Sequence, residues 1–358
     1  MSVLQEVYTL YNGVKIPKIG FGTWQLPQEK AEQTVITAIK TGYRHIDTAL
    51  GYGNEKGVGA GVRNSGVARE EIFVTTKIPA EVKSYAAAKE AIAQSLENLN
   101  IGYIDLLLIH APRPWDEMHA GGKKPYADEN FAVWTAMEEA FNAGMVRAIG
   151  VSNFEIFDME NIVSRCKIQP MVNQYRMFLG NFQAEIVNYC RAHNMLAEAY
   201  SPIATGRLAR NEKVIKIAEK YGASGAQLSI RYLLQKGVLP LPKTTHEEYM
   251  RQNAAVEFTL SDADMGILDS LKTVSCSFDE SPEITPVLKE KMHRIGVDEY
   301  EQLNEPGARG VFTSLKAAGE EVTYEELLAL DATAKGIRVS ELTETEIAKL
   351  KAFFEEGK

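Results

Sequence analysis

The sequence predicts a (β/α)8 barrel followed by a small all-helical domain. Short apolar, strand-like segments alternate with helical segments in units of about 30 residues. Residues 104–109 are apolar except for Asp105, a pattern typical of a parallel strand covered on both faces by helices. Asp47, Tyr52, Lys77 and His110 lie at or just past the ends of such runs. In a parallel barrel these strand ends meet at one mouth, so we expect one shared site.

A short hairpin precedes the barrel. Tyr8 to Ile16 reads as two strands on either side of an Asn12-Gly13 turn, and Asn-Gly is the strongest short-range signal for a hairpin. We expect this hairpin to plug the bottom of the barrel.

Eight strands follow, each with a helix after it. The strands are expected at residues 19–23, 43–48, 72–77, 104–109, 146–151, 170–175, 195–200 and 238–241. The main helices are expected at residues 29–41, 54–65, 85–98, 130–143, 183–193, 212–220 and 225–235, with a short one after residue 153. An irregular loop, residues 112–128, is rich in Pro, Gly and Lys and is expected to border the site.

The chain divides near residue 275. Residues 276–285 are polar, contain a proline and break the helical periodicity, so we interpret them as a linker. Residues 286–358 read as several short helices without a strand. The expected organisation is therefore a barrel over residues 1–275, a linker, and a small helical domain.

Charge and composition exclude several classes of protein. The 358 residues carry a formal net charge of −9, and residues 276–358, with 18 acidic and 10 basic side chains, account for −8 of it. Nucleic-acid binding without sequence preference requires a basic face, so we expect no nucleic-acid partner. No run approaches the roughly 20 apolar residues of a membrane span.

The cysteines and the N-terminus point to a reducing compartment. Cys166, Cys190 and Cys276 include no close pair and have no histidine nearby at metal-ligand spacing. The first residues lack the basic and apolar segments of a signal peptide. We therefore expect a cytoplasmic protein that uses no metal.

The four residues at the strand ends make chemical sense as a proton donor. A tyrosine hydroxyl donates poorly at neutral pH, but a lysine ammonium beside it lowers its pKa, and an aspartate keeps that lysine charged. A histidine can then orient a substrate oxygen. Together, Asp47, Tyr52, Lys77 and His110 suit protonation of a carbonyl group that receives a hydride.

Each of these residues also has a plain structural interpretation when taken singly. Asp47 is a suitable cap for the helix after its strand, and His110 suits a hydrogen-bonded histidine of the core. Lys77 and Tyr52 are equally acceptable as solvated surface groups. Their order and spacing together favour the catalytic interpretation.

Residues 1–275 resemble an aldo-keto reductase along the whole predicted barrel. The matching segments are Gly20-Phe21-Gly22-Thr23-Trp24, Ile46-Asp47-Thr48-Ala49, Tyr52-Gly53-Asn54-Glu55, Thr75-Thr76-Lys77, Leu106-Leu107-Leu108-Ile109-His110, Ile149-Gly150-Val151-Ser152-Asn153-Phe154, Asn173-Gln174, Ala199-Tyr200-Ser201-Pro202 and Leu241-Pro242-Lys243-Thr244. The chain has no Gly-x-Gly-x-x-Gly fingerprint. That absence fits the resemblance, because this family binds its nicotinamide cofactor on a barrel.

The resemblance implies a role for each matching residue. Tyr52 is the general acid, Lys77 its pKa modifier, Asp47 the partner of Lys77, and His110 orients the carbonyl. The implied cofactor contacts are Ser152, Asn153 and Gln174 at the nicotinamide carboxamide, Tyr200 on the ring, Ser201 and Thr205 at the pyrophosphate, Lys243 and Thr244 at the 2'-phosphate, and Asn253 at the adenine. Trp24 is implied to line the substrate pocket.

Two positions depart from the family pattern. Tyr249 stands where an arginine usually faces the 2'-phosphate, and a phenol cannot replace a bidentate guanidinium. The implied cofactor is therefore NADPH, with NADH as an alternative. Ala111 stands where many members carry a tryptophan, so we expect a roomier pocket that accepts bulkier carbonyls.

The C-terminal segment resembles the helical C-terminal domain of TfoX-type competence regulators. The resemblance lies in the spacing and apolar pattern of residues 307–312, 327–332, 335–337 and 342–343. The alternative interpretation is a helical appendage that packs on the barrel or mediates oligomerisation. Its acidic charge argues against direct DNA contact in either case.

These observations predict an NAD(P)H-dependent reductase of aldehydes and ketones. The candidate substrates are dicarbonyls such as methylglyoxal, or keto-sugars. The alternative function is a nicotinamide-binding regulatory subunit that senses redox state, with the C-terminal domain as its interaction module. A pure sensor has less need of all four reacting residues, which favours the enzyme.

Overall fold

The computed structural model describes residues 2–119, 124–204, 208, 211–271, 278, 281, 283–298, 302–303, 306–335 and 337–356. The chain forms two compact units. The main part of the first unit is Met1–Ala204 with Leu208–Ser270, and the second runs from Leu271 to Lys358.

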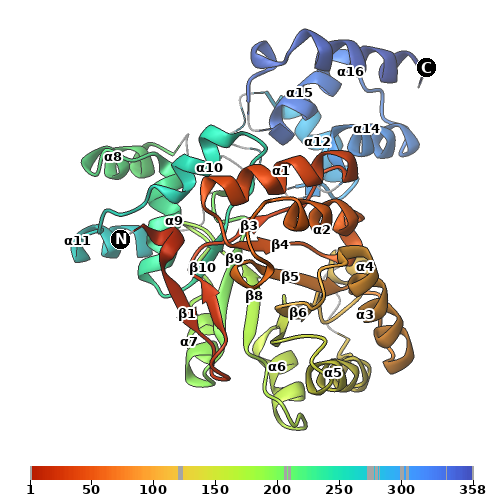
Figure 1. Ribbon diagram of the computed structural model, residues 1–358. Helices are drawn as coiled ribbons and strands as arrows, with labels where there is room; N and C mark the ends of the chain where they lie inside the picture. The colour runs from red at the N-terminus through yellow and green to blue at the C-terminus, as the bar shows by residue number, and fades with distance from the viewer. Residues whose placement is uncertain are drawn as a thin grey trace. The chain divides into compact units, whose positions relative to one another are not determined.

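The first unit is a parallel eight-stranded barrel (Figure 1). Its strands pair in the order β10-β9-β8-β7-β6-β5-β4-β3. They are β3 Phe21–Gly22, β4 His45–Asp47, β5 Phe73–Ile78, β6 Leu106–Ile109, β7 Ile149–Ser152, β8 Val172–Arg176, β9 Leu196–Tyr200 and β10 Leu239–Leu241. The amide of Gly20 donates to the carbonyl of Pro240 at 3.1 Å, and that of Gly22 to the carbonyl of Pro242 at 3.0 Å. These bonds link the β3 edge to the β10 edge, and the predicted (β/α)8 fold is confirmed.

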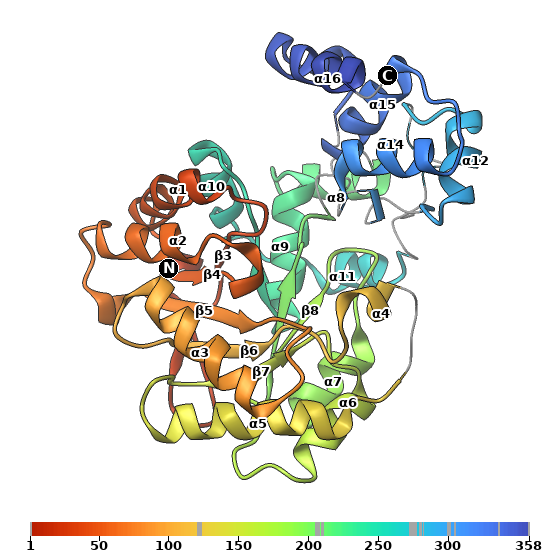
Figure 2. The ribbon, with the colours of Figure 1, turned by 90° about the vertical axis from the view of Figure 1, so that its right-hand side faces the viewer.

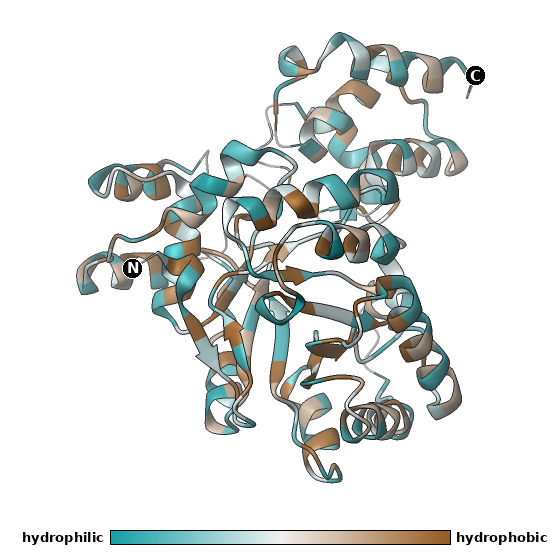
Figure 3. Ribbon diagram, viewed as in Figure 1, coloured by the Kyte–Doolittle hydropathy of each residue, from teal (hydrophilic) through white to brown (hydrophobic). Residues whose placement is uncertain are grey.

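Helices surround the barrel (Figure 2). They are α1 Gln28–Thr41, α2 Glu55–Arg63, α3 Tyr85–Leu99, α4 Trp115–His119, α5 Ala127–Asn142, α6 Ile156–Val163, α7 Ala184–Ala192, α8 Glu212–Lys220, α9 Gly225–Gln235, α10 Glu247–Ala254 and α11 Asp262–Asp269. The 3-10 turns are η1 Val3–Gln5, η2 Leu50–Tyr52 and η3 Arg69–Glu71. In Figure 3 these helices carry hydrophobic and hydrophilic residues side by side, as amphipathic helices do. The loop expected at residues 112–128 in fact contains α4.

The predicted hairpin closes the bottom of the barrel. Strands β1 Val7–Thr9 and β2 Lys15–Pro17 pair antiparallel. Leu10 and Ile16 are buried in one cluster with side chains of the barrel strands, among them Phe73 and Leu106. The lower end of the barrel is thus filled by apolar side chains.

Close packing between α2 and α3 fixes the segment that follows β4. Gly59 of α2 lies so near α3 that a Cβ atom there would sit 1.9 Å from the carbonyl oxygen of Leu99. Only glycine fits at this contact. The tight fit holds the turn η2, which precedes α2 and ends with Tyr52.

The second unit is helical in its described residues. Its elements are α12 Pro286–Arg294, α14 Gly307–Ala317, α15 Tyr324–Lys335, the 3-10 turn η6 Val339–Glu341 and α16 Glu344–Glu356. Leu288, Phe312, Leu315, Leu327 and Leu330 are among the buried residues of its core. This core belongs to the second unit alone, which agrees with the expected all-helical domain.

Candidate active site

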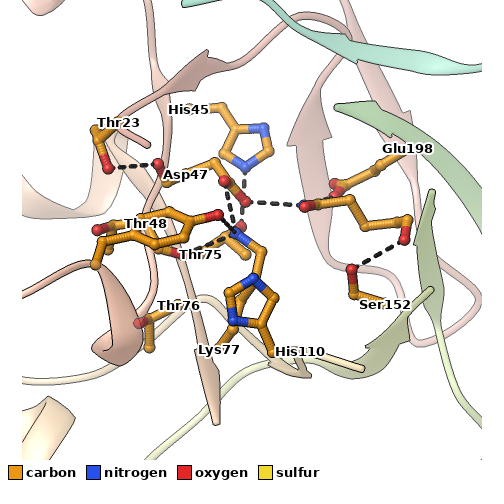
Figure 4. Close-up of polar contacts among 12 residues, drawn as sticks. Thr23, His45, Asp47, Thr48, Thr75, Thr76, Lys77, His110, Ser152 and Glu198 are labelled. Carbon is orange, nitrogen blue, oxygen red and sulfur yellow. Dashed lines mark hydrogen bonds and ion pairs between the residues drawn. The ribbon is translucent and has the colours of Figure 1, made fainter. Parts of the chain in front are cut away.

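Four side chains from successive strand ends meet at the mouth of the barrel (Figure 4). Asp47 ends β4, Lys77 lies near the end of β5, and His110 directly follows β6. Tyr52 closes the turn η2 after β4. Figure 4 shows Asp47, Lys77 and His110 converging, so the structure brings together the four residues that the sequence singled out.

Lys77 is the centre of this group. Its Nζ donates to Asp47 Oδ1 at 2.7 Å, to the Thr48 carbonyl at 2.9 Å and to the Tyr52 hydroxyl at 3.4 Å. The side chain is fully buried. An ammonium has three hydrogens, and all three are engaged. Lys77 is therefore placed to act through Tyr52 and not on a substrate directly.

The ionisation of these groups differs in one respect from the sequence expectation. Burial raises the pKa of Tyr52, and the Lys77 cation opposes that rise without reversing it. The Lys77 cation thus acts to lower the pKa of the tyrosine, as expected, but desolvation of the phenolate, which the sequence analysis did not consider, outweighs it. Burial also acts to lower the pKa of Lys77, but Asp47 and Tyr52 raise it overall, so the ammonium stays charged.

His110 is a neutral imidazole beside the tyrosine. Burial and the Lys77 cation hold the pKa of His110 well below its usual value. Its ring lies edge-on to Tyr52, with the ring centroids 5.5 Å apart. A neutral imidazole carries one N–H, which it can donate to a substrate oxygen.

The turn that carries Tyr52 is held by a buried asparagine. Asn54 Nδ2 donates to the carbonyls of Thr23 and Leu26 at 2.9 and 3.1 Å, and its Oδ1 accepts from Thr48 Oγ1 at 2.8 Å. Because these bonds tie the loop after β3 to the segment after β4, they fix the position of Tyr52.

The substrate side of the site contains an aromatic residue that the sequence did not single out. Trp115 begins α4, and its ring lies edge-on to His110 with the centroids 5.2 Å apart. Ala111, expected to leave the pocket roomier, has no exposed surface. Trp24 is 40 % exposed in the loop after β3. A tryptophan inside a loop rich in Pro and Gly was the available signal for Trp115.

A second polar group follows β7, β8 and β9. Ser152 Oγ donates to the Gln174 carbonyl at 3.0 Å, and Asn153 Nδ2 donates to the His110 carbonyl at 3.0 Å. The Tyr200 hydroxyl donates to Asn153 Oδ1 at 2.9 Å. The structure thus brings Ser152, Asn153, Gln174 and Tyr200 together, and the bond to His110 joins them to the first group.

Glu198 connects to the same network and was missed by the sequence analysis. Gln174 Nε2 donates to Asp47 Oδ2 at 2.8 Å and to Glu198 Oε2 at 3.0 Å. Glu198 is fully buried in β9, and burial raises its pKa to about 8. The signal was an acidic residue at the centre of an otherwise apolar strand.

The remaining predicted cofactor contacts lie after β9, after β10 and on α10. Lys243 and Thr244 follow β10, Asn253 is buried on α10, and Tyr249 is exposed on the same helix. Ser201 follows β9 with a left-handed φ of 53°. Thr205 lies outside the described residues.

Lys243 is a half-buried cation. Among the described residues no carboxylate pairs with it, and burial lowers its pKa. A cation in such a position suits an anionic ligand.

The described residues contain no cluster of three or more His, Cys, Asp or Glu side chains that could hold a metal ion. No helix among them has the length and apolar character needed to cross a membrane.

The fold and the site define a class, which is an oxidoreductase acting on carbonyl groups. Residues 18–273 match the Aldo/keto reductase family. The chain belongs to this family, and it is an NAD(P)H-dependent oxidoreductase.

Curated relatives and solved structures agree with the family assignment. The chain is 41% identical over 270 residues to "Glyoxal reductase" of Bacillus subtilis, covering 75% of this chain and 93% of that protein. It is 40% identical over 277 residues to "9,11-endoperoxide prostaglandin H2 reductase" of Trypanosoma cruzi, covering 76% and 93%. A Bombyx mori aldo-keto reductase crystallised with NADP superposes with a TM-score of 0.67 at 31% identity, covering 75% of this chain and 92% of that one.

The C-terminal segment has a separate similarity. Residues 277–354 match the TfoX C-terminal domain. The predicted resemblance is confirmed, and the chain joins a reductase barrel to this helical domain.

Proposed function

We propose that the protein reduces aldehydes and ketones to alcohols, with NADPH as the hydride donor and Tyr52 as the proton donor. The observation that carries this proposal is the buried chain in which Asp47 holds Lys77 and Lys77 contacts the Tyr52 hydroxyl. It is the arrangement expected for a phenol that gives up a proton during the reaction.

Each residue of the site has a separate role in the reduction. When bound, NADPH would supply the hydride that the carbonyl carbon accepts. Tyr52 gives its proton to the carbonyl oxygen, so one hydride and one proton convert C=O into CH–OH. Lys77 stabilises the phenolate left on Tyr52, and Asp47 keeps Lys77 in place. His110, a neutral N–H donor, orients the carbonyl oxygen.

The chain's own residues fit NADPH in two places. Ser152, Asn153 and Gln174 present polar groups beside the proton-donating site, as a nicotinamide carboxamide requires, and Tyr200 adjoins them with an aromatic ring. At the other end, Lys243 suits the 2'-phosphate that distinguishes NADPH from NADH. The reductases crystallised with NADP or NADPH support this choice of cofactor.

Small reactive carbonyl compounds are the best candidate substrates. The relative named glyoxal reductase supports α-dicarbonyls such as methylglyoxal, and keto-sugars are a further candidate. The experiment is to measure initial rates of NADPH and NADH oxidation with methylglyoxal and other aldehydes. Turnover with NADPH supports the proposal. Cofactor binding without any turnover would contradict it and favour a regulatory subunit.

Replacing Trp115 should change which substrates are used. Because this ring packs against His110, Trp115→Ala should open the carbonyl end of the pocket. We expect kcat/KM for methylglyoxal to fall by about 5- to 150-fold, since burial of an aromatic ring contributes on the order of 1–3 kcal/mol, and kcat/KM for bulky aromatic aldehydes to fall less or to rise. Equal changes for small and bulky aldehydes would contradict this role.

Restoring an arginine at position 249 should strengthen the preference for NADPH. Tyr249 is exposed on α10, so Tyr249→Arg places a guanidinium there without disturbing the core. We expect the Kd for NADPH to fall about three- to tenfold, as for an exposed charge-assisted contact, and the Kd for NADH to stay unchanged. The uncharged variant Tyr249→Gln should show neither effect. Equal tightening for both cofactors would mean that residue 249 does not face the 2'-phosphate.

We further propose that residues 1–275 form the catalytic domain, that residues 276–285 form a linker, and that residues 286–358 form an interaction or oligomerisation module. The hydrophobic core of the second unit supports a separate C-terminal module, and this core also includes Phe278 and Ile284 from the proposed linker. The match to the TfoX C-terminal domain also supports it.

A further inference from the structure

Glu198 is a buried acid that no step of the proposed reaction uses. It lies in β9 with no exposed surface. Its Oε2 accepts one hydrogen bond, from Gln174 Nε2 at 3.0 Å. Its Oε1 is buried and has no hydrogen-bond partner among the described residues. Burying a carboxyl group while one of its oxygens has no hydrogen-bond partner costs free energy. We therefore expect the oxygen that does form a bond, Oε2, to have a specific role.

The contacts of Gln174 indicate that task. One hydrogen of its amide nitrogen goes to Asp47 Oδ2 at 2.8 Å and the other goes to Glu198. Asp47 is the ion-pair partner of Lys77 and can only accept, so the nitrogen of the Gln174 amide must face it. A single bond to Asp47 would let the amide plane turn about that bond. The second bond, to Glu198, fixes the plane.

Fixing the amide plane also fixes its oxygen. With both hydrogens held by carboxyl groups, Gln174 Oε1 points away from them, and no described residue donates to it. The carboxamide of a nicotinamide carries an NH2 group, which requires an acceptor. The neighbouring Asn153 Oδ1 already accepts from the Tyr200 hydroxyl. Gln174 Oε1, by contrast, accepts no hydrogen bond from a described residue, so both of its lone pairs are available.

We propose that Glu198 is a positioning residue for cofactor recognition, which holds the Gln174 amide so that its Oε1 accepts a hydrogen bond from the nicotinamide carboxamide. This inference rests on the proposed function, because it assumes that the nicotinamide lies beside Ser152, Asn153 and Gln174. Glu198 itself contacts neither cofactor nor substrate.

The test compares the binding of two oxidised cofactors by isothermal titration calorimetry, which needs no turnover. One is NADP+, and the other is its 3-acetylpyridine analogue, in which a methyl group replaces the NH2 and the carbonyl is kept. Loss of one neutral hydrogen bond weakens binding about two- to tenfold. We expect the wild-type protein to prefer NADP+ by such a factor.

Two variants distinguish loss of the Gln174 hydrogen bond from a general effect of substitution at Glu198 on cofactor binding. Glu198→Met removes the acceptor for the Gln174 hydrogen at similar volume, and we expect the preference for NADP+ to fall below about twofold. Glu198→Gln keeps an acceptor oxygen and should retain the wild-type preference. If Glu198→Met does not fold, Glu198→Leu provides the same loss with a smaller side chain.

The outcomes are distinct. An undiminished preference in a folded Glu198→Met or Glu198→Leu protein overturns the inference, and so does a wild-type protein that binds both cofactors equally. A wild-type protein that binds neither cofactor contradicts the proposed function itself.

Discussion

The variant Tyr52→Phe should lose carbonyl reduction while keeping the cofactor. The Tyr52 hydroxyl is the group that Lys77 contacts, and it lies beside His110, so its removal leaves the carbonyl oxygen without a proton donor. Positioned proton transfer is typically worth about 10²- to 10⁴-fold, and we expect kcat with methylglyoxal to fall by that range. The Kd for NADPH, measured by calorimetry, should change by less than about twofold, because the phenol takes no part in holding the cofactor.

Tyr85→Phe is the matched control. Tyr85 is 37 % exposed on the outer helix α3, and its hydroxyl donates to Glu139 of α5 at 2.6 Å and not to a residue of the site. The same hydroxyl deletion at this position should leave kcat within about twofold of wild type. If Tyr52→Phe retained wild-type kcat, Tyr52 would not be the proton donor.

The variant Glu198→Gln should be more stable than the wild type at alkaline pH. Burial raises the pKa of Glu198 from 4.5 to about 8. Between these values the folded protein keeps a proton that the unfolded chain has released, so the folded state loses stability as the pH rises from 4.5 to 8. Glutamine cannot ionise and escapes this loss. At about 1.36 kcal/mol per pH unit, the advantage of the variant should grow by on the order of 4 kcal/mol between pH 5 and pH 8.

Urea unfolding of both proteins at pH 5 and pH 8 measures this difference. Glu185→Gln, an exposed position on α7, is the control and should follow the wild type at both pH values. An advantage of Glu198→Gln that is the same at pH 5 and pH 8 would mean that Glu198 is ionised in the folded protein across this range.

The fold was predictable from local patterns in the sequence. Three short-range patterns carried the prediction: alternating strands and helices, an Asn-Gly turn, and the largely apolar segment at residues 104–109. The structure confirms the barrel and its hairpin. The short helix α4 was missed because its five residues follow prolines and glycine-rich sequence comes after them. A segment of that length has no helical period to detect.

The sequence predicted which catalytic residues form the site, but it did not predict how burial changes their pKa values. The sequence placed Asp47, Lys77 and His110 together because the carboxyl ends of parallel strands lie at one end of a barrel, and the strand pairings are parallel. The sequence could not show that burial outweighs the Lys77 charge at Tyr52, because desolvation depends on packing from elements distant along the chain. Glu198 was missed for the same reason, since its partner Gln174 comes from another strand.

The most direct test of the central claim follows the hydride itself. NADPH with two deuterium atoms at C4 of the nicotinamide is incubated with the protein and methylglyoxal, and the product is analysed by mass spectrometry and NMR. We predict one deuterium on the carbinol carbon for each NADPH oxidised. Bound cofactor that stays reduced, or an alcohol without deuterium, would contradict the assignment of this protein as a carbonyl reductase.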